Sequence, residues 1–475
     1  MSSYLNYEKE LCVRAVDSVS FGMDLLGCGS SSDEEEEVVA VAPPPSKVTG
    51  KTVGEVAKDA CGHGKKRSVD SQGANGAAQK KPRAGPVAAK PGSSGKVAKA
   101  SSHHYPVCMK KTIDALSKAV LSFSLDRSGV RMVCGGQCDQ VKIYDFGAYS
   151  SHKGRALRTL AVEEDDAGKT VSSVKYSATG KKMIVSRWAP TPTIYDREGR
   201  KLISLIKGDP YIADMARTKG HVSAVTDVAW DNSKQDESGV LTASSDGSLR
   251  TWDLNDKTEF GNLVCHQVLK ARDAQGRRVG VNSCAYFPTK GALIGAGCSD
   301  GSLQLWRTKG TGKYDRPHLS AYHAHSPNGS GDSGATGGTA CIRFSPNGRH
   351  VLSRSGVDSG DCVRLWDLRK FSKALNTFSN VFTHHPAANC EFVKGGRSLL
   401  VPTTEGESSK LLVFDALTSA IDPVKTIPLD FGSAKAVGVC AEWHSKLDQI
   451  FVGGTDGSIS ILYDPKVSKR GAMLF

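Results

Sequence analysis

The chain has 475 residues, 39% of them hydrophobic and 23% charged, which is enough for two or three average domains or for one large β architecture. No run of 18 apolar residues occurs, and the start "MSSYLNYEKELCV" carries charges where a signal peptide needs an apolar core. We therefore expect a soluble protein made in the cytosol, with no membrane partner and with its 13 cysteines reduced. No two Cys/His pairs stand at zinc spacing, so we predict neither a metal nor a cofactor.

The formal net charge of +13 is distributed unevenly along the chain. Residues 1–50 hold 3 basic and 9 acidic residues, whereas residues 51–100 hold 11 basic and 3 acidic residues. Residues 27–104 are also poor in aromatic and large aliphatic side chains, so they cannot bury enough apolar area to offset the entropy of ordering. We therefore predict that residues 1–104 form a disordered tail, with an acidic run at "SSSDEEEE" (30–37).

Two basic clusters in this tail are separated by twelve residues within "KKRSVDSQGANGAAQKKPR" (65–83). Clusters at that distance are typical of a bipartite nuclear import signal, because an extended linker of this length spans two acidic pockets on a carrier. The alternative is a solvated charge run. The pattern predicts a nuclear protein whose import residues are Lys65, Lys66, Arg67, Lys80, Lys81 and Arg83.

From residue 105 onward the sequence repeats itself. An aromatic residue that ends a β-rich run, usually followed by Asp, recurs seven times, in "VKIYDF", "PTIYDR", "LRTWDL", "LQLWRT", "VRLWDL", "LLVFDA" and "SILYDP". Asp-Gly turn signals at 246–247, 300–301 and 456–457 precede three of these runs, and further apolar runs lie upstream of each turn. Three strands and the segment leading to the next unit then make one four-stranded antiparallel blade.

This pattern resembles the WD-repeat β-propeller, and the resemblance covers essentially all of 105–464. Seven third strands imply an all-β fold, a seven-bladed WD-repeat β-propeller over residues 105–475 that follows the disordered tail. The stretch "PVCMKK" (106–111) is expected to act as the outer strand of the last blade and to close the ring.

Blade three shows the motif best, with "GH" at 220–221 and "LTASSDGSLRTWDL" at 241–254. In the family, a loop His, a Ser or Thr on the second strand, the turn Asp and the strand Trp form a buried hydrogen-bonded set. The resemblance assigns these roles to His221, Thr242 or Ser244, Asp246 and Trp252. Such a set satisfies buried polar groups, so its expected role is structural.

The segments "IKGDPYIADMARTKGH" (206–221), "RLWDLRKF" and "YDPKVSKRGAMLF" are similar to those of the gastrulation-defective family, also called WD repeat-containing protein 70. The resemblance implies a non-enzymatic nuclear adaptor. The family is linked to a cullin-RING ubiquitin ligase through its damaged-DNA-binding adaptor subunit, with roles in histone ubiquitination and the response to DNA breaks. Its members also occur with late spliceosomes, so a spliceosome-associated scaffold is the alternative.

The sequence offers no catalytic residues. It has no phosphate-binding Gly loop with Lys-Ser/Thr, no nucleophile elbow and no metal-binding His pair at helical spacing. The "GDSG" within residues 329–338 lies in a Gly/Ser-rich insertion without the flanking strands that would build an oxyanion hole. We therefore expect no enzymatic activity.

Two neighbouring loops on the upper face, which is the face of the Asp-Gly turns, are rich in cations. The loop 206–221 supplies Lys207, Arg217 and Lys219, and "LKARDAQGRR" (269–278) supplies Lys270, Arg272, Arg277 and Arg278. Adjacent blades should place these loops side by side, where phosphates of a nucleic-acid backbone or an acidic peptide would bind weakly. A solvated basic face is the alternative. No interleaved exposed aromatic residues are expected there, so base stacking is not predicted.

The lower face bears the turns that follow each third strand, and "WDLRKF" lies on one of them. Trp-Asp-x-Arg at the end of a blade resembles the signature of substrate receptors that dock on the ligase adaptor. We therefore predict a docking site at Trp366, Asp367 and Arg369, in which Asp367 steadies the Arg369 guanidinium. The alternative is that Arg369 is a solvated cation.

Overall fold

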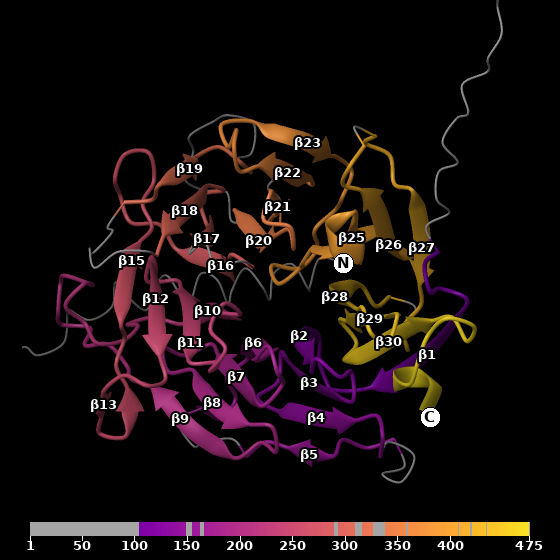
Figure 1. Ribbon diagram of the computed structural model, residues 1–475, viewed down its shortest axis with the longest axis horizontal. Coiled ribbons are helices and arrows are strands. Elements are labelled where there is room, and N and C mark those ends of the chain that lie inside the picture. The colour runs from indigo at the N-terminus through magenta and orange to yellow at the C-terminus, as the bar shows by residue number, and fades with distance from the viewer. Residues whose placement is uncertain are drawn as a thin grey trace, which may run out of the picture. The chain divides into compact units, whose positions relative to one another are not determined.

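The computed structural model describes residues 104–148, 154–161, 166–288, 293–308, 316–325, 338–357, 360–406, 408–418, 420–433 and 435–474. The import residues and the acidic run lie outside these described residues. Seven sheets, built mainly of antiparallel strands, follow one another around a common centre in chain order (Figure 1). This arrangement confirms the predicted all-β fold with seven propeller blades.

The first four blades run from Val120 to Ala321. Blade one contains β2 (Val120–Leu125), β3 (Arg131–Gly136), β4 (Val141–Asp145) and β5 (Arg158–Thr159). Blade two contains β6 (Val171–Tyr176), β7 (Lys182–Arg187), β8 (Thr193–Asp196) and β9 (Lys201–Leu205). Blade three contains β10 (Val225–Trp230), β11 (Gly239–Ser244), β12 (Ser248–Asp253) and β15 (Gln267–Lys270). Blade four contains β16 (Val281–Tyr286), β17 (Leu293–Cys298), β18 (Leu303–Arg307) and β19 (Leu319–Ala321).

The remaining blades complete the ring. Blade five contains β20 (Thr339–Phe344), β21 (His350–Ser355), β22 (Val363–Asp367) and β23 (Ala374–Phe378). Blade six contains β24 (Glu391–Val393), β25 (Ser398–Glu405), β26 (Ser408–Asp415) and β27 (Lys425–Leu429), with the short helix η2 (Lys394–Gly396) before β25. Blade seven contains β28 (Gly438–His444), β29 (Gln449–Gly454) and β30 (Ser458–Tyr463), and η3 (Gly471–Leu474) follows it.

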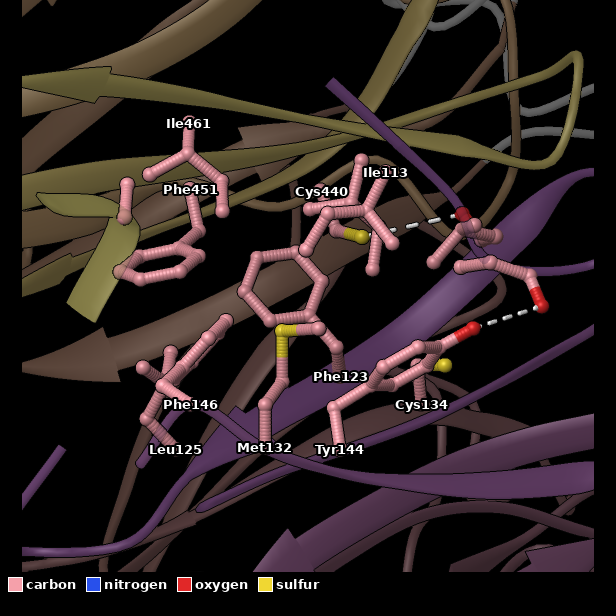
Figure 2. Packing of buried hydrophobic residues seen from close by; sticks show 14 of the residues in the cluster. Ile113, Phe123, Leu125, Met132, Cys134, Tyr144, Phe146, Cys440, Phe451 and Ile461 are labelled. Atoms are coloured by element: carbon pink, nitrogen blue, oxygen red, sulfur yellow. Dashed lines mark hydrogen bonds between the residues drawn. The ribbon is translucent and has the colours of Figure 1, made fainter. Parts of the chain in front are cut away.

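Blade seven takes its outer strand from the other end of the propeller. β1 (Met109–Asp114) pairs antiparallel with β30, with Ile113 opposite Ile459. The predicted closure is therefore confirmed, although the strand covers Met109–Asp114 rather than 106–111. Figure 2 shows Ile113 packed in one cluster with Cys440, Phe123 and Phe451, so this buried side chain anchors the otherwise largely exposed closure strand where blades seven and one meet.

The sheet of blade two has more strands than the four that were predicted. The turn after β12 of blade three contains a small hairpin, β13 (Thr258–Glu259) and β14 (Asn262–Leu263). β14 pairs in parallel with β9, so this sheet has six strands (Figure 1). The fully buried Leu263 explains why the hairpin stays on this edge. The insertion carries no turn signal that would have revealed its partner strand.

A bulge recurs at the inner rim of the ring. In six of the seven blades the pairing of the first and second strands shifts after the first residue of the inner strand. Three bulged residues are polar, and each donates a side-chain hydrogen bond to a main-chain carbonyl of the next blade: Ser172 to Val225 (2.8 Å), Thr226 to Val281 (2.7 Å) and Asn282 to Thr339 (3.3 Å). These bonds tie consecutive blades together at their inner strands.

The described cysteines are all free thiols, and most of them are buried in the blades. No helix of the described residues is long and apolar enough to cross a membrane. Within the same residues, no three His, Cys, Asp or Glu side chains gather as metal ligands would.

Candidate docking surfaces

The predicted hydrogen-bonded set of blade three is formed, and Thr242 is its hydroxyl member. The His221 Nδ1 lies 3.0 Å from Asp246 Oδ2, and its Nε2 lies 2.7 Å from Thr242 Oγ1. The Trp252 indole N–H donates to the same Thr242 oxygen at 2.8 Å. Ser244, the alternative, instead donates to the carbonyl of Ala224 at 2.8 Å.

Burial lowers the pKa of His221, against the opposing effect of Asp246. The imidazole is therefore neutral, and Nδ1–H donates to Asp246 while Nε2 accepts the Thr242 hydroxyl proton. His221 and Thr242 are fully buried, so no substrate reaches them. The set stabilises the blade, as the resemblance implied.

Blade five holds a second set that sequence reasoning missed. The His325 Nε2 lies 2.7 Å from Ser353 Oγ, to which the Trp366 indole N–H also donates at 2.8 Å. Burial lowers the pKa of His325 to about 3. The set is hard to find in the sequence because the Gly/Ser-rich insertion lengthens the spacing between His325 and Ser353 beyond that of the His and Thr in blade three. The "HAH" at 323–325 is the one sequence signal for its histidine. In blade four, by contrast, the Trp306 indole N–H has no partner among the described residues.

The two basic loops of the upper face lie side by side, as predicted. The Lys270 ammonium is 3.0 Å from Asp214 Oδ1, which joins the loop 206–221 to the end of β15. The main chain of Ala271 also donates to the carbonyl of Gly247, in the Asp-Gly turn of blade three. Both loops therefore adjoin that turn.

Many of the predicted cations of this face are neutralised by carboxylates. Besides Lys270 with Asp214, the pairs are Lys219 with Glu259 (2.6 Å), Arg277 with Asp273 (2.7 Å) and Arg217 with Asp214 (3.9 Å). Lys207, Arg272 and Arg278 meet no carboxylate within the described part of the chain. Two of these three cations, Arg272 and Arg278, lie opposite each other in a β-bridge of the loop 269–278.

The prediction that this face lacks exposed aromatic residues is wrong. Tyr211 lies in the loop 206–221 with 94% of its surface exposed. It follows "GDP", and its main-chain N–H donates to the Asp209 carboxylate, so the turn directs the ring away from the blade.

The loop 206–221 is held from below by a buried arginine that sequence reasoning also missed. Arg250 in β12 is fully buried, and its guanidinium donates to the carbonyls of Thr218 (2.8 Å) and Met215 (3.0 Å). A buried guanidinium in the middle of a strand is costly unless its donors are satisfied. Here the loop supplies acceptors for both Nη groups, although the Nε has no partner among the described residues, and the arginine in turn gives the loop a defined conformation.

The predicted docking residues lie on the lower face at the end of β22. Trp366 is buried and packs against Phe371 at 5.5 Å between ring centroids. Asp367 does not pair with the Arg369 guanidinium as predicted. Its carboxylate instead accepts the main-chain N–H of Arg369 at 2.9 Å, since Asp at this position caps the turn. The exposed Arg369 side chain is left without a carboxylate partner among the described residues.

Three further cations lie near Arg369. The main-chain N–H of Leu368 donates to the carbonyl of Arg349, which places the two turns of this blade together. Arg349, Lys370 and Lys373 are exposed, and no carboxylate pairs with them in the described ranges. We call the four residues Arg349, Arg369, Lys370 and Lys373 the blade-five rim.

Several known proteins are similar to this chain in sequence. The WD domain, G-beta repeat family matches residues 214–253 and 265–307. WD repeat-containing protein 70 of Xenopus tropicalis is 33% identical over 367 residues, which are 76% of this chain and 54% of that protein. Gastrulation defective protein 1 homolog of Drosophila melanogaster is 33% identical over 361 residues, which are 75% of this chain and 50% of that protein. WD repeat-containing protein 70 of Homo sapiens is 31% identical over 375 residues, which are 78% of this chain and 52% of that protein. The chain thus spans about half the length of these relatives.

Proposed function

Because the chain is a WD-repeat propeller protein similar to WD repeat-containing protein 70 and its gastrulation-defective relatives, we propose that it is a non-enzymatic nuclear scaffold that serves as a substrate receptor of a cullin-RING ubiquitin ligase. WD-repeat propellers act in general as protein-interaction scaffolds. In this proposed role, the lower face binds the ligase adaptor subunit and the upper face binds the protein that is to be ubiquitinated. Chromatin proteins at sites of DNA damage are the expected substrates.

The blade-five rim is the observation that carries this proposal. Its cations are exposed and unpaired within the described residues, whereas many of those on the upper face already have carboxylate partners. Arg369 also stands on a turn that the Asp367 carboxylate holds through the main chain, so its guanidinium is free to donate to carboxylates or carbonyls of a partner. The main chain of this turn is therefore fixed before a partner binds, and only the Arg369 side chain itself has to be ordered.

The test is affinity purification of tagged protein from nuclear and cytoplasmic extracts, followed by identification of what is recovered with it. We expect the ligase adaptor with the wild-type protein, in the nuclear fraction, and about thirtyfold or greater loss of adaptor binding with Arg369→Ala. Arg200→Ala is the matched control, because Arg200 lies on the corresponding turn of blade two but pairs with Asp196.

Adaptor recovery with Arg369→Ala at the wild-type yield would contradict the docking role. Recovery of late spliceosome proteins without ligase subunits would favour the alternative, a scaffold in pre-mRNA splicing. Recovery from the cytoplasmic fraction alone would contradict the nuclear location predicted from residues 65–83.

A further inference from the structure

A small recess opens on the upper face between the two basic loops. It lies where Asp214 of the loop 206–221 approaches Lys270, Arg272 and Arg278, beside Gly247 of the Asp-Gly turn. Its volume is about 90 Å³. Pockets for whole small-molecule ligands are several times larger, so a recess of this size fits one functional group of a larger ligand.

The charge of the recess is positive. Three cationic side chains, Lys270, Arg272 and Arg278, face one carboxylate, that of Asp214. Arg272 uses one Nη1 donor on the carbonyl of Gly276 at 2.7 Å, and the side chain of Arg278 has no hydrogen-bond acceptor within the described part of the chain. The donors in the recess therefore outnumber the acceptors that the protein itself provides.

The walls of the recess are held in place before any ligand arrives. Gly247 has a φ of +77°, and a Cβ there would lie 2.4 Å from the Arg278 Cγ, so Arg278 packs directly against the turn because the glycine has no side chain. On the other side, buried Arg250 holds the carbonyls of Met215 and Thr218, which follow Asp214 in the loop. A ligand would thus meet walls whose main chain is already placed, and only the exposed ends of the cationic side chains would have to be ordered.

We propose that this recess binds the phosphate group of a phosphorylated serine or threonine in a partner protein. Such a phosphate carries a charge of about −1.5 to −2 and three strong acceptor oxygens, which match two guanidinium forks and one ammonium. Tyr211, exposed three residues before Asp214, offers an aromatic surface to the flanking peptide. The recess lies on the face opposite the blade-five rim, so this inference stands whether or not that rim docks a ligase.

A nucleic-acid backbone fits less well. A strand of phosphodiesters needs a row of free cations along its path, since each neutralised phosphate contributes to the affinity. Lys219, Arg217 and Arg277 are already paired with acids, which leaves one concave site rather than a row.

Asp214 has a defined role in this arrangement. Its pKa is lowered by the main-chain N–H of Ala216 and by the Lys270 ammonium, so it is a carboxylate that occupies part of the cationic site. A phosphate must compete with it for Lys270. Replacing Asp214 by Asn is therefore expected to strengthen phosphate binding.

The experiment measures binding of the full chain to three probes by fluorescence anisotropy: a degenerate pool of phosphoserine peptides, the same pool with serine, and a single-stranded RNA of matched net charge. We expect the phosphoserine pool to bind best. Arg278→Ala should weaken that binding by about tenfold or more, because hydrogen bonds to charged groups are lost. Arg277→Ala is the matched control, since the neighbouring Arg277 pairs with Asp273 outside the recess.

A second pair of variants separates the recess from the general charge of the face. Asp214→Asn should raise affinity for the phosphoserine pool, whereas Asp209→Asn, in the same loop but outside the recess, should not. Any one of four results would overturn the proposal. These are equal effects of Arg277→Ala and Arg278→Ala, equal effects of the two Asn variants, stronger binding of the RNA, or no preference for the phosphorylated pool. Because the substituted side chains are exposed or half-exposed, unchanged melting temperatures are expected and show that each variant is folded.

Discussion

At the scale of single residues, this propeller places polar and charged side chains inside its blades and supplies many of them with partners. Asp227 in β10 is mostly buried, yet its carboxylate accepts hydrogen bonds from Ser173 (3.0 Å), Ser283 (3.0 Å) and the main chain of Cys284 (3.1 Å). These donors come from blades two and four, on either side of its own. Such a carboxylate costs little only while every donor stays in place, so it helps to specify the order in which blades pack.

The buried histidines make stability depend on pH. Burial lowers the pKa of His325 from its usual 6.5 to about 3, so the folded protein holds it neutral while the unfolded chain protonates it below pH 6.5. The unfolded state therefore binds more protons between pH 6.5 and 3, and this contribution to stability is present above pH 6.5 and lost as pH falls. The slope is at most about 1.4 kcal/mol per pH unit.

Urea unfolding of the wild type and of His325→Gln between pH 7.5 and 4.5 measures this effect. The variant is expected to be less stable at pH 7.5 but to lose less free energy of unfolding on acidification. His221→Gln should behave in the same way, because burial lowers the pKa of that imidazole too. Parallel pH profiles for the wild type and both variants would show that the imidazoles are not the groups responsible.

At the scale of elements, the recurrent bulge connects one blade to the next. A bulge leaves one residue out of the ladder, so its side chain is free to reach outside its own sheet. In blade three the Thr226 hydroxyl lies 2.7 Å from the Val281 carbonyl of blade four and 3.1 Å from the Ala243 carbonyl of its own blade. In blades one and seven the bulged residues are Leu121 and Val439, which share one small apolar cluster instead.

Thr226→Val keeps the shape of the side chain and removes the hydroxyl. We expect a loss of about 1–3 kcal/mol in the free energy of unfolding, because the carbonyls lose their donor in a partly buried place. Thr258→Val is the control: Thr258 is exposed in β13, and the same substitution there should change stability by less than about 0.5 kcal/mol. Equal effects in equilibrium urea unfolding would mean that the bond between blades contributes nothing.

At the scale of the whole propeller, stability depends on a strand that comes from the start of the ring and pairs at its end. β1 removes the open edge that blade seven would otherwise present, and the side chain of Ile113 is buried among residues of blades seven and one. The residues that meet here are more than 300 positions apart in sequence. One example is Cys440, whose thiol donates a hydrogen bond to the Val120 carbonyl. Closure is therefore the step with the highest cost in chain entropy.

Ile113→Ala is expected to lower the free energy of unfolding by about 2–5 kcal/mol, through lost burial and the cavity left behind. Its exposed neighbour Thr112 provides the control, and Thr112→Ala should be close to neutral. Hydrogen exchange adds a local measurement: the amides of β30 should exchange faster in Ile113→Ala than in the wild type. Unchanged protection there would contradict the closing role of β1.

The sequence by itself determined the repeat, the number of blades and the closure of the ring, because strand periodicity is a local signal that each blade repeats and Asp-Gly turns mark three of the blades. It also identified His221, Asp246 and Trp252 as members of one set, since they lie within one blade, but left its hydroxyl member open between Thr242 and Ser244. Tertiary structure decided what depends on neighbours distant in sequence. The parallel pairing of β14 with β9, the carboxylate partners of Lys219 and Lys270 and the second set around His325 all arise from contacts between residues far apart in the sequence. The same holds for the turn at Arg369. Its sequence suggested an ion pair, whereas the nearest donor to Asp367 is the main chain of the turn itself, and this leaves the guanidinium exposed.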